Sequence, residues 1–455
     1  MRKVRYNCRV MVYNRKVLLI KPKTSLAQDG NYREMRYFTP WQRPDGKKDE
    51  PYIEEYYLEE IVGRITGQDK VAFGEGVIST KDSCVGAETC EELFTADAPH
   101  IQMGLNGVEI FTNSSGSHHE LRKLNTRISL ILEATRKSGG IYLYSNQRGC
   151  DGDRLLYDGS PLVIVNGKVV AQGSQFSLND VEVVTATVDL EDVRSYRCSP
   201  SRGLRANKIK YPRIDLCTLR LSRKGKDFGP LELSKEIEVR YHSPEEEIAL
   251  GPACWLWDYL RRSKASGFLL PLSGGIDSCS TAVLVFSMCK MVVQAANDGN
   301  EQVIKDLRRI AGEPEDSTWL PNAQEFSNRI FHTCYMGTIN SSKETRSRAK
   351  KLALDIGAYH TEFDIDSVVT ALISLFTLVT NFRPMYTVHG GSKEENLALQ
   401  NIQARLRMVI AYLFAQLLPT IRKRRNGGSL LVLGLVFVFT IGGLSGVVLA
   451  NASHR

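Results

Sequence analysis

The most specific chemical pattern in the chain is the run Ser273-Gly274-Gly275-Ile276-Asp277-Ser278, which separates a short apolar stretch from a long one. Two adjacent glycines allow a tight turn whose N–H groups approach a phosphate, and the N-terminus of a following helix favours the same negative charge. Ser273 and Ser278 add hydroxyl donors, and Asp277 can hold a Mg²⁺ ion that bridges phosphates. The run therefore predicts a phosphate-binding loop, although not of the Walker type, because the Gly-Lys-Ser/Thr ending is absent. The alternative is a Ser/Gly turn in which Asp277 caps a helix.

A second candidate is Cys90, which lies between Glu88 and Glu91 after the segment 74–85. Structural thiols are usually buried among apolar residues, so a cysteine among acids is unusual. A nearby ammonium group would lower the pKa of a thiol and would also stabilise a developing oxyanion. From the residues alone, a nucleophilic cysteine and an ordinary core cysteine remain equal alternatives.

Alternating strands and helices must position these residues. Two hairpins are expected, at 8–13 with 16–20 and at 162–165 with 168–171, and the second turns at Asn166-Gly167, a pair favoured in type I′ turns. The other expected strands are 107–112, 141–144, 181–188, 268–272, 330–336 and 430–433, and the expected helices are 121–137, 244–264, one running from the loop to about 295, and 401–418. This alternation predicts layered α/β architecture.

Composition limits the class of protein. The 455 residues favour two domains, and ten cysteines without a Cys-x-x-Cys pair favour a reducing, cytoplasmic compartment. The net charge of +8 comes from residues 194–240, which contain 13 Lys/Arg and 5 Asp/Glu, so the remainder of the chain is neutral. Because a nucleic-acid groove would spread its basic residues over a domain face, we expect no nucleic-acid binding and interpret 194–240 as a solvated connector.

The Ser-Gly-Gly-x-Asp-Ser run resembles the loop of the ATP-pyrophosphatase family, whose members adenylate a substrate and then displace AMP with an amine. Residues 333–336, 340–342 and 345–346 resemble the adenine-side segment of NAD synthetases, and 395–408 is similar to their dinucleotide-binding helix. The resemblance implies a Rossmann-like, doubly wound domain over residues 241–434.

The N-terminal part resembles the nitrilase, or carbon–nitrogen hydrolase, family. Residues 20–23, 31–34 and 90–92 match its pattern, while 113–119 and 151–154 look closely similar to the glutaminase branch found in eukaryotic NAD synthetases. The resemblance implies an αββα sandwich over residues 1–193.

The two resemblances together imply a set of site residues. Cys90 would be the nucleophile, and Lys23, favoured over Lys21 by its spacing to Tyr32, would stabilise the tetrahedral intermediate. The further implied contacts are Tyr32, Glu91 and Phe94 for glutamine; Pro271, Leu272, Ser273, Gly274, Gly275, Ile276, Asp277 and Ser278 for ATP, with Ser273 also catalytic; Asp277 for Mg²⁺; and Asn401 and Arg405 for deamido-NAD. From the sequence alone, without the resemblance, a solvated helix face is the favoured interpretation of Arg405 and Arg407. His118 and His119 are expected to be pocket or core histidines.

Two features depart from the family pattern. The family's general-base glutamate precedes the lysine, but Met1–Pro22 contains no acid, so Glu34 or another carboxylate would have to substitute. At the other end, 435–455 is an apolar tail foreign to the family, and we expect both ends of the enzyme to be missing. Residues 429–450 carry no charge and follow the basic run 422–425, so as a helix they would be long enough to span a bilayer. Since 430–434 resembles a core strand, we favour a cytosolic protein over a tail anchor.

The resemblance thus implies a shortened member of the glutamine-dependent NAD(+) synthetase family, which would use ATP and Mg²⁺, act on small molecules and form a homo-oligomer. Cys90 would release ammonia from glutamine, and the second domain would use that ammonia to amidate deamido-NAD. One alternative is a catalytically incomplete nucleotide-binding or regulatory variant, possibly tail-anchored. Another is a GMP synthetase-like amidotransferase, which is disfavoured because the chain has no Gly-x-Cys-x-Gly elbow.

Overall fold

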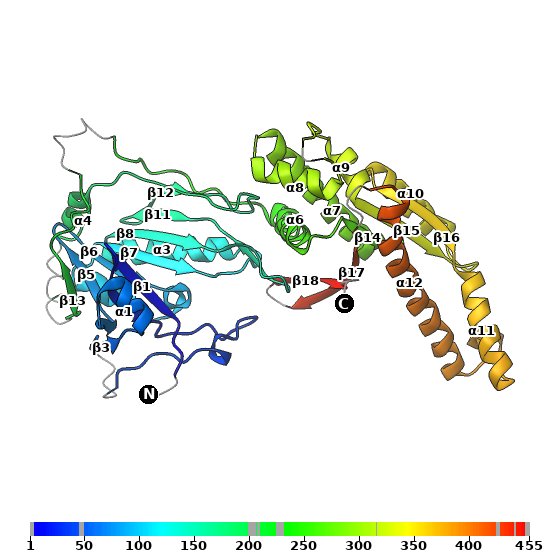
Figure 1. The fold of residues 1–455 in the computed structure, drawn as a ribbon, viewed down its shortest axis with the longest axis horizontal. Helices are drawn as coiled ribbons and strands as arrows, with labels where there is room; N and C mark the ends of the chain where they lie inside the picture. Colours follow the sequence, from blue (N-terminus) through cyan, green and yellow to red (C-terminus); the bar gives the residue numbers. More distant parts are fainter. Residues whose placement is uncertain are drawn as a thin grey trace. The chain divides into compact units, whose positions relative to one another are not determined.

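The computed structural model describes residues 4–44, 50–198, 206, 210–223, 232–314, 316–424, 428–440 and 443–450. After Gly434 it describes the backbone only. The chain divides into two compact units (Figure 1). Unit 1 comprises Met1–Arg148, Tyr157–Gln175 and Val181–Tyr241, and unit 2 comprises Gly149–Leu156, Phe176–Asp180 and His242–Arg455.

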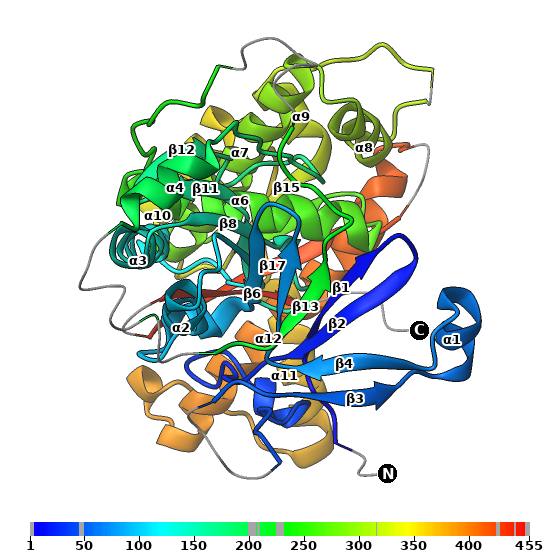
Figure 2. The same ribbon diagram turned by 90° about the vertical axis from the view of Figure 1, so that its left-hand side faces the viewer.

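Unit 1 contains two β-sheets. The smaller sheet has the strand order β1 (Cys8–Tyr13), β2 (Lys16–Pro22), β4 (Lys70–Gly74), β3 (Ile53–Tyr57), and Figure 2 shows its β1–β2 hairpin. The larger sheet has the order β12 (Lys168–Gln172), β11 (Leu162–Val165), β8 (Ile141–Asn146), β7 (Ile110–Ser115), β6 (Cys84–Glu88), β5 (Val77–Thr80), β13 (Arg213–Leu216). The helical segments of this unit are η1 (Glu34–Arg36), α1 (Glu60–Thr66), η2 (Cys90–Phe94), α2 (Pro99–Leu105), α3 (Lys123–Ser138) and α4 (Leu190–Tyr196).

Both predicted hairpins of unit 1 are confirmed. Asn14 and Arg15 between β1 and β2, like Asn166 and Gly167 between β11 and β12, have the positive φ angles that type I′ turns require. The core of the unit forms where α3 packs its apolar side chains, including Ile128 and Ile131, against the larger sheet.

Two stretches of unit 1 differ from the sequence interpretation. The solvated connector assigned to residues 194–240 contains β13, which pairs parallel with β5 as an edge strand of the larger sheet. Residues 181–188, predicted as a strand, join no ladder; Val181 and Val183 are both more than three-quarters exposed. β-branched composition favours an extended chain, but a strand also needs a pairing partner, and sequence composition does not reveal one.

Unit 2 is built on one sheet with the strand order β16 (Tyr359–Asp364), β15 (Phe331–Gly337), β14 (Phe268–Pro271), β17 (Leu431–Thr440), β18 (Gly443–Ala450). Strands β14 to β17 pair in parallel, and β18 returns antiparallel to β17. The helices are α6 (Pro244–Ser263), α7 (Ile276–Asn297), α8 (Glu301–Ala311), α9 (Ala323–Ile330), α10 (Lys343–Asp355), α11 (Asp366–Thr380) and α12 (Lys393–Ile421), with the short η3 (Thr387–His389). Because β14 is the first strand along the chain and lies between β15 and β17, its carboxyl end is a topological switch point, where α/β sheets bind ligands.

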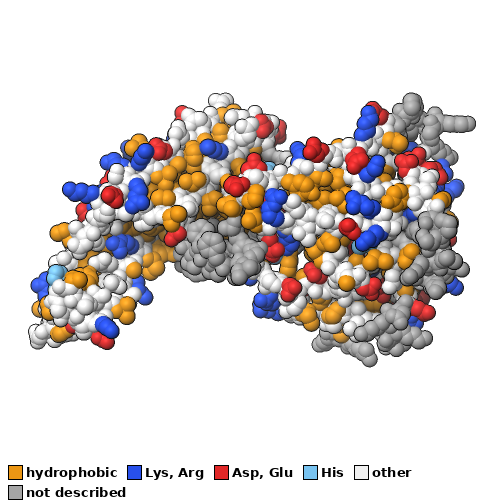
Figure 3. Space-filling model, turned by 180° about the vertical axis from the view of Figure 1, so that it is seen from behind, with side chains coloured by type: hydrophobic (Ala, Val, Ile, Leu, Met, Phe, Trp, Pro, Cys, Tyr) orange, Lys and Arg blue, Asp and Glu red, His pale blue; other side chains and the backbone are white. Residues whose placement is uncertain are grey.

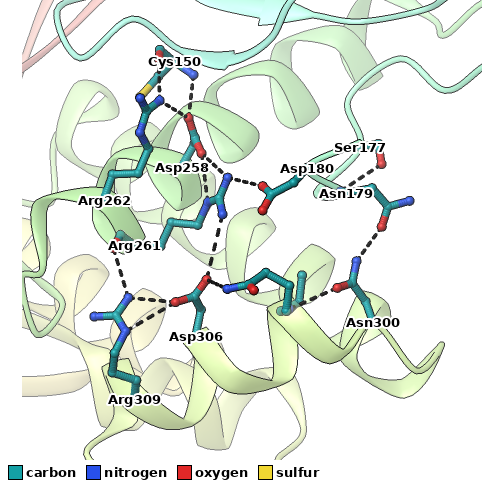
Figure 4. A network of polar contacts seen from close by, with 12 residues as sticks. Cys150, Ser177, Asn179, Asp180, Asp258, Arg261, Arg262, Asn300, Asp306 and Arg309 are labelled. Carbon is teal, nitrogen blue, oxygen red and sulfur yellow. Dashed lines mark hydrogen bonds and ion pairs between the residues drawn. The ribbon is translucent and has the colours of Figure 1, made fainter. Parts of the chain in front are cut away.

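Segments from the middle of the chain complete unit 2 (Figure 4). Asp258 on α6 accepts hydrogen bonds from the backbone N–H of Cys150, at 2.7 Å, and from the guanidinium groups of Arg261 and Arg262. Arg261 also pairs with Asp180. Cys150, Leu156 and Phe176 are buried in the same apolar cluster as α6 and α7. Two short strands, β9 (Arg148–Cys150) and β10 (Leu156–Asp158), lie where the chain passes between the units.

The C-terminal strand prediction is confirmed at its start, since Leu430–Leu433 is buried and β17 pairs with β14. The following apolar residues form strands rather than the helix that a bilayer span would need. Arg422 and Arg424, taken as a membrane-flanking charge, are instead anchors within unit 2: Arg422 donates to the carbonyl oxygen of Asn328 at 2.6 Å, and Arg424 donates to that of Ile310 at 2.6 Å. Arg425 of the same run and residues 451–455 lie outside the described residues.

Two helices of the described chain, α7 and α12, are long and apolar enough by length and composition to cross a membrane. α7 is a core helix of unit 2, with Val285, Met288 and Val292 fully buried.

Candidate functional site

Cys90 is the first residue of η2 and lies on the sharp turn that follows β6. It is half-buried and has a φ angle of +49°, in the left-handed region that non-glycine residues rarely adopt. The Oδ1 atom of Asn113 on β7 accepts a hydrogen bond from the Cys90 N–H at 3.0 Å and so offsets part of the backbone strain. The turn places the thiol at the end of a strand, as the sequence predicted.

A buried network orients the Asn113 amide. Its Nδ2 donates to the Tyr142 hydroxyl at 3.0 Å, and that hydroxyl donates to the carboxylate of Glu88. Burial raises the pKa of Glu88, but hydrogen bonds from His100 and Tyr142 more than offset this and hold it below its usual range. Because the ionised carboxylate of Glu88 can only accept hydrogen bonds, it fixes the direction of each donor in this series of hydrogen bonds. The amide oxygen of Asn113 therefore faces Cys90.

Lys23, the predicted lysine, is 3% exposed and forms an ion pair with Glu34, with 2.6 Å between Nζ and Oε2. Glu34 also accepts hydrogen bonds from Asn7 Nδ2 and from the backbone N–H of Ala27, each at 2.7 Å. The acid considered as a substitute base therefore holds the lysine ammonium in place.

Lys21, the competing candidate, is equally buried but has a different partner. Its Nζ lies 3.4 Å from Oε2 of Glu92, a carboxylate with no exposed surface. Glu91, the neighbour of Cys90, is influenced by Lys23: burial raises the pKa of Glu91, and the charges of Lys23 and Lys123 oppose that rise. Lys23 therefore acts electrostatically on the residue next to Cys90, whereas Lys21 pairs with Glu92.

The predicted glutamine contacts Tyr32 and Glu91 lie with Lys123, a residue that sequence reasoning did not identify. The Lys123 ammonium lies 5.2 Å above the centroid of the Tyr32 ring and 3.4 Å from its hydroxyl. Burial raises the pKa of Tyr32, and the Cys90 thiol is close enough to contribute to this rise. Phe94 packs against the core of unit 1. The structure therefore brings Cys90, Tyr32, Glu91 and two lysines into one neighbourhood.

His118 is buried and His119 is partly buried, which fits the expected pocket or core histidines. His118 lies against the Tyr32 ring, with 4.6 Å between centroids, and its Nε2 is 2.8 Å from Glu120. His119 Nδ1 is 3.9 Å from Asp158.

The second candidate site is the loop between β14 and α7, at the switch point of the unit 2 sheet. The Ser273 and Ser278 hydroxyls lie 3.0 Å apart, and the Gly275 N–H donates to Ser273 Oγ at 3.3 Å. Ser273, Gly275 and Asp277 are exposed at this end of the sheet, so hydroxyl groups and the N-terminus of α7 are available to a phosphate. Of the residues predicted to contact ATP, Pro271 ends the strand, and Leu272, which follows it, has a fully buried side chain.

The loop packs directly on the backbone of Thr345 in α10. Gly274 has a φ angle of +78°, and a Cβ atom there would overlap the Thr345 carbonyl oxygen. Thr345 Oγ1 lies 3.1 Å from the Tyr335 hydroxyl, and Arg346 stacks over the Tyr335 ring. The segments that resemble the adenine side of NAD synthetases are therefore adjacent to the loop.

Asn401 and Arg405 lie one turn apart on an exposed face of α12, with 3.0 Å between Arg405 Nη1 and Asn401 Oδ1. Their side chains thus bond to one another rather than to the loop. Arg407 is not a solvated residue, because its Nε donates to the Met336 carbonyl at the carboxyl end of β15, at 3.1 Å. This bond places that part of α12 at the carboxyl end of the strands, which is the end of the sheet that carries the loop.

Asp277 is the one carboxylate in the loop, and across the described residues no cluster of three or more His, Cys, Asp and Glu side chains could hold a metal on its own. A single exposed carboxylate beside a phosphate loop fits Mg²⁺, which is commonly held by one or two carboxylates together with substrate phosphates.

Comparisons with known proteins identify both domains. Residues 1–198 match the carbon–nitrogen hydrolase family, and residues 252–421 match the NAD synthase family. A glutamine-dependent NAD(+) synthetase from Saccharomyces cerevisiae is 59% identical over 436 residues, which are 95% of this chain and 60% of the relative. The Homo sapiens protein of the same name is 54% identical, again over 95% of this chain and 60% of its own length. The chain thus spans about 60% of the length of these curated relatives.

A solved structure gives the same result for the fold. The glutamine-dependent NAD(+) synthetase from Cytophaga hutchinsonii has a TM-score of 0.66 at 22% identity, over 95% of this chain and 59% of that one. Both expected fold classes, a nitrilase-like sandwich and a Rossmann-like synthetase domain, are confirmed. The chain belongs to the glutamine-dependent NAD(+) synthetase family and carries a carbon–nitrogen hydrolase domain followed by an NAD synthase domain.

Proposed function

We propose that unit 1 releases ammonia from glutamine and that unit 2 uses ATP and ammonia to convert deamido-NAD to NAD(+). The observation that carries this proposal is the presence, in one chain, of three features: a cysteine on a strained turn, a buried lysine whose charge acts on the adjacent Glu91, and a phosphate loop at a topological switch point. High identity to glutamine-dependent NAD(+) synthetases over both domains supports it.

In the proposed glutaminase step, the Cys90 sulfur attacks the side-chain amide carbon of glutamine. The C–N bond breaks, ammonia leaves with a proton, and water then hydrolyses the glutamyl thioester to glutamate and the free thiol. Lys23, held by Glu34 at 2.6 Å, supplies a fixed positive charge for the oxyanion of the tetrahedral intermediate. Because Lys23 is buried, water screens this charge poorly.

Glutamine recognition is assigned to the neighbours of Cys90. The free ends of glutamine are a carboxylate and an ammonium group, so a cation and an anion at fixed places would select it. Lys123 above the Tyr32 ring suits the carboxylate, and Glu91 suits the ammonium group. Phe94, at the edge of the apolar core, would limit the pocket on one side.

In the proposed synthetase step, the nicotinate carboxylate of deamido-NAD attacks the α-phosphorus of ATP, and pyrophosphate leaves. Ammonia then attacks the acyl carbon and displaces AMP, which yields NAD(+). The loop 271–278 would hold the ATP phosphates through hydroxyl and N–H donors, with Ser273 nearest the reacting phosphate. Asn401 and Arg405 on α12 are assigned to deamido-NAD.

Asp277 would hold the Mg²⁺ ion at this site. When bound, the ion neutralises the charge of the pyrophosphate leaving group.

The glutaminase half is tested by Cys90→Ala with Cys84→Ala as the matched control, since Cys84 is buried at the start of β6, the strand that precedes Cys90. We expect Cys90→Ala to abolish both glutamine hydrolysis and covalent labelling by a glutamine-analogue electrophile, while Cys84→Ala keeps both. Formation of NAD(+) from ammonia, ATP and deamido-NAD should be equal in the two variants. Equal labelling of Cys90→Ala and the parent chain would refute the assignment.

We also propose that the protein forms homo-oligomers through α11 and α12. Several large apolar side chains of this helix pair are about half-exposed or more: Leu378 and Val379 of α11, and Val409, Leu413 and Leu417 of α12. Figure 3 shows apolar atoms on the visible face of unit 2. Sedimentation velocity should give a larger species for the parent chain than for Leu413→Glu; identical coefficients would contradict this.

A cytoplasmic location remains our proposal. It is supported by ten cysteines that are all free thiols, as a reducing compartment favours. Fractionation of cells that express the chain would place it in the soluble fraction, and carbonate-resistant membrane association would contradict this.

A further inference from the structure

Glu92, the third residue of η2, uses both carboxylate oxygens and has no exposed surface. Oε2 accepts a hydrogen bond from the Thr89 N–H at 2.7 Å and faces Lys21 Nζ at 3.4 Å. Oε1 accepts two bonds from Thr24, one from the backbone N–H at 2.9 Å and one from the hydroxyl at 2.8 Å. Four donors from two distant parts of the chain thus converge on one buried carboxylate.

Helix capping explains only one of these contacts. A glutamate at this position of a capping box needs just the Thr89 N–H. Thr24 and Lys21 are 68 and 71 residues away in the chain; Lys21 lies at the end of β2, and Thr24 follows that strand. Their contacts tie the turn that begins η2 to a different sheet of the same unit.

The two tied points flank the proposed catalytic pair. Thr89 immediately precedes Cys90, and Thr24 immediately follows Lys23. We infer that Glu92 is a positioning residue that fixes Lys23 relative to Cys90. This inference rests on the proposed function, because it gives Lys23 and Cys90 a joint role.

The four contacts at residue 92 require a carboxylate on a side chain as long as that of glutamate. All four partners are donors, so the NH₂ group of a glutamine would face at least one donor and leave it unpaired. Aspartate is shorter by one C–C bond, about 1.5 Å, and cannot reach Thr24 while it holds Thr89. Lys21 then has a structural role, because it balances the buried charge of Glu92. This role separates Lys21 from the catalytic role proposed for Lys23.

The test measures the pH dependence of Cys90 alkylation by iodoacetamide in the full chain, followed peptide by peptide by mass spectrometry. The variants are Glu92→Asp, Lys23→Met and, as a matched control, Glu55→Asp, which shortens an exposed glutamate paired with Lys70 in the same unit. Loss or displacement of the Lys23 ammonium raises the pH at which the thiolate forms. We therefore expect the alkylation midpoint to rise in Lys23→Met and in Glu92→Asp and to stay unchanged in Glu55→Asp.

Glutamine hydrolysis provides a second readout. A misplacement of about 1 Å can cost up to ~10²-fold in rate, so kcat of Glu92→Asp should fall roughly 10–100-fold. KM for glutamine should change less than about threefold, because the proposed binding residues Tyr32 and Lys123 do not contact Glu92 through any described bond. NAD(+) formation from ammonia verifies that unit 2 is intact.

The outcomes separate the two proposals. A rise in midpoint in both Lys23→Met and Glu92→Asp supports the inference. A rise in Lys23→Met without one in Glu92→Asp overturns the inference and leaves the proposed function standing, whereas no change in Lys23→Met overturns the Lys23–Cys90 pairing and the inference with it. If Glu92→Asp does not fold, the test uses Thr24→Val, which removes only the hydrogen bond from the Thr24 hydroxyl. A smaller rise in the alkylation midpoint then supports the inference, and an unchanged midpoint overturns it.

Discussion

Replacement of Gly274 by alanine should disable the loop between β14 and α7. The residue has a φ angle of +78°, and an alanine there costs roughly 1–2 kcal/mol, or about 5–30-fold in an equilibrium constant. The added Cβ would also overlap the Thr345 carbonyl oxygen and lie 2.9 Å from the carbonyl carbon, where ordinary contact begins at 3.4 Å. The two backbones must separate by at least ~0.5 Å, which adds to the cost of the φ angle alone.

Gly275 supplies the matched control in the same loop. It has a φ angle of −82°, and a Cβ there would meet only Ser273 Oγ, at 3.4 Å. We expect Gly275→Ala to change the free energy of unfolding by less than about 1 kcal/mol, since its backbone conformation suits alanine. Gly274→Ala should lose roughly 1–2 kcal/mol or more and bind ATP at least ~10-fold more weakly.

The assay is isothermal titration calorimetry with ATP and Mg²⁺, combined with urea unfolding followed by tryptophan fluorescence. Three of the four tryptophans, Trp255, Trp257 and Trp319, belong to unit 2, so the signal reports mainly on that unit. Parent-like ATP affinity in Gly274→Ala would refute the reasoning. So would equal losses of unfolding free energy in the two variants, because the two glycines differ in φ angle and in their contact with Thr345.

Two further predictions concern buried charges. Burial, with neighbouring arginines, lowers the pKa of His332 to about 3; the unfolded chain therefore binds more protons, and acidification from pH 6.5 to 5 should cost unit 2 about 2 kcal/mol. Urea unfolding of a Trp41→Phe chain should show this slope, and adding His332→Gln should remove it; equal slopes would contradict the prediction. In unit 1, Arg127 and Asp158 are fully buried 2.6 Å apart, so Arg127→Met should destabilise by roughly 3–5 kcal/mol, measured by Trp41 fluorescence. Most of that loss should return when Asp158→Asn is added, and no recovery would contradict the ion-pair explanation.

The parts of the fold that local chemistry determines could be predicted from the sequence. Asn166-Gly167 adopts a type I′ turn for reasons contained in those two residues, and the loop after Phe268–Pro271 follows from its glycines. Pairing between distant segments could not be predicted in this way. β13 lies in a stretch whose basic composition indicates a solvated connector, and only its ladder with β5 identifies it as a strand.

The same difference between local motifs and distant contacts applies to the residues of the candidate site. Cys90 and Lys23 were accessible through resemblance of short motifs. Glu92 was not, because a glutamate at the start of a helix is explained by capping alone, and its bonds to Thr24 cross 68 residues. Lys123 was missed for a similar reason: a lysine in the first turn of a helix usually faces water, whereas here it lies over Tyr32.

The short segments 149–156 and 176–180 have a consequence for how this protein can be divided. They come from the region that matches the carbon–nitrogen hydrolase family, yet Cys150, Leu156 and Phe176 are part of the core of unit 2. A fragment that starts at His242 would lack these apolar residues and would leave Asp258 without the Cys150 N–H. The synthetase unit is therefore not a module that can be cut out or exchanged between relatives at one junction. A transplant would have to carry these two segments from the upstream domain as well.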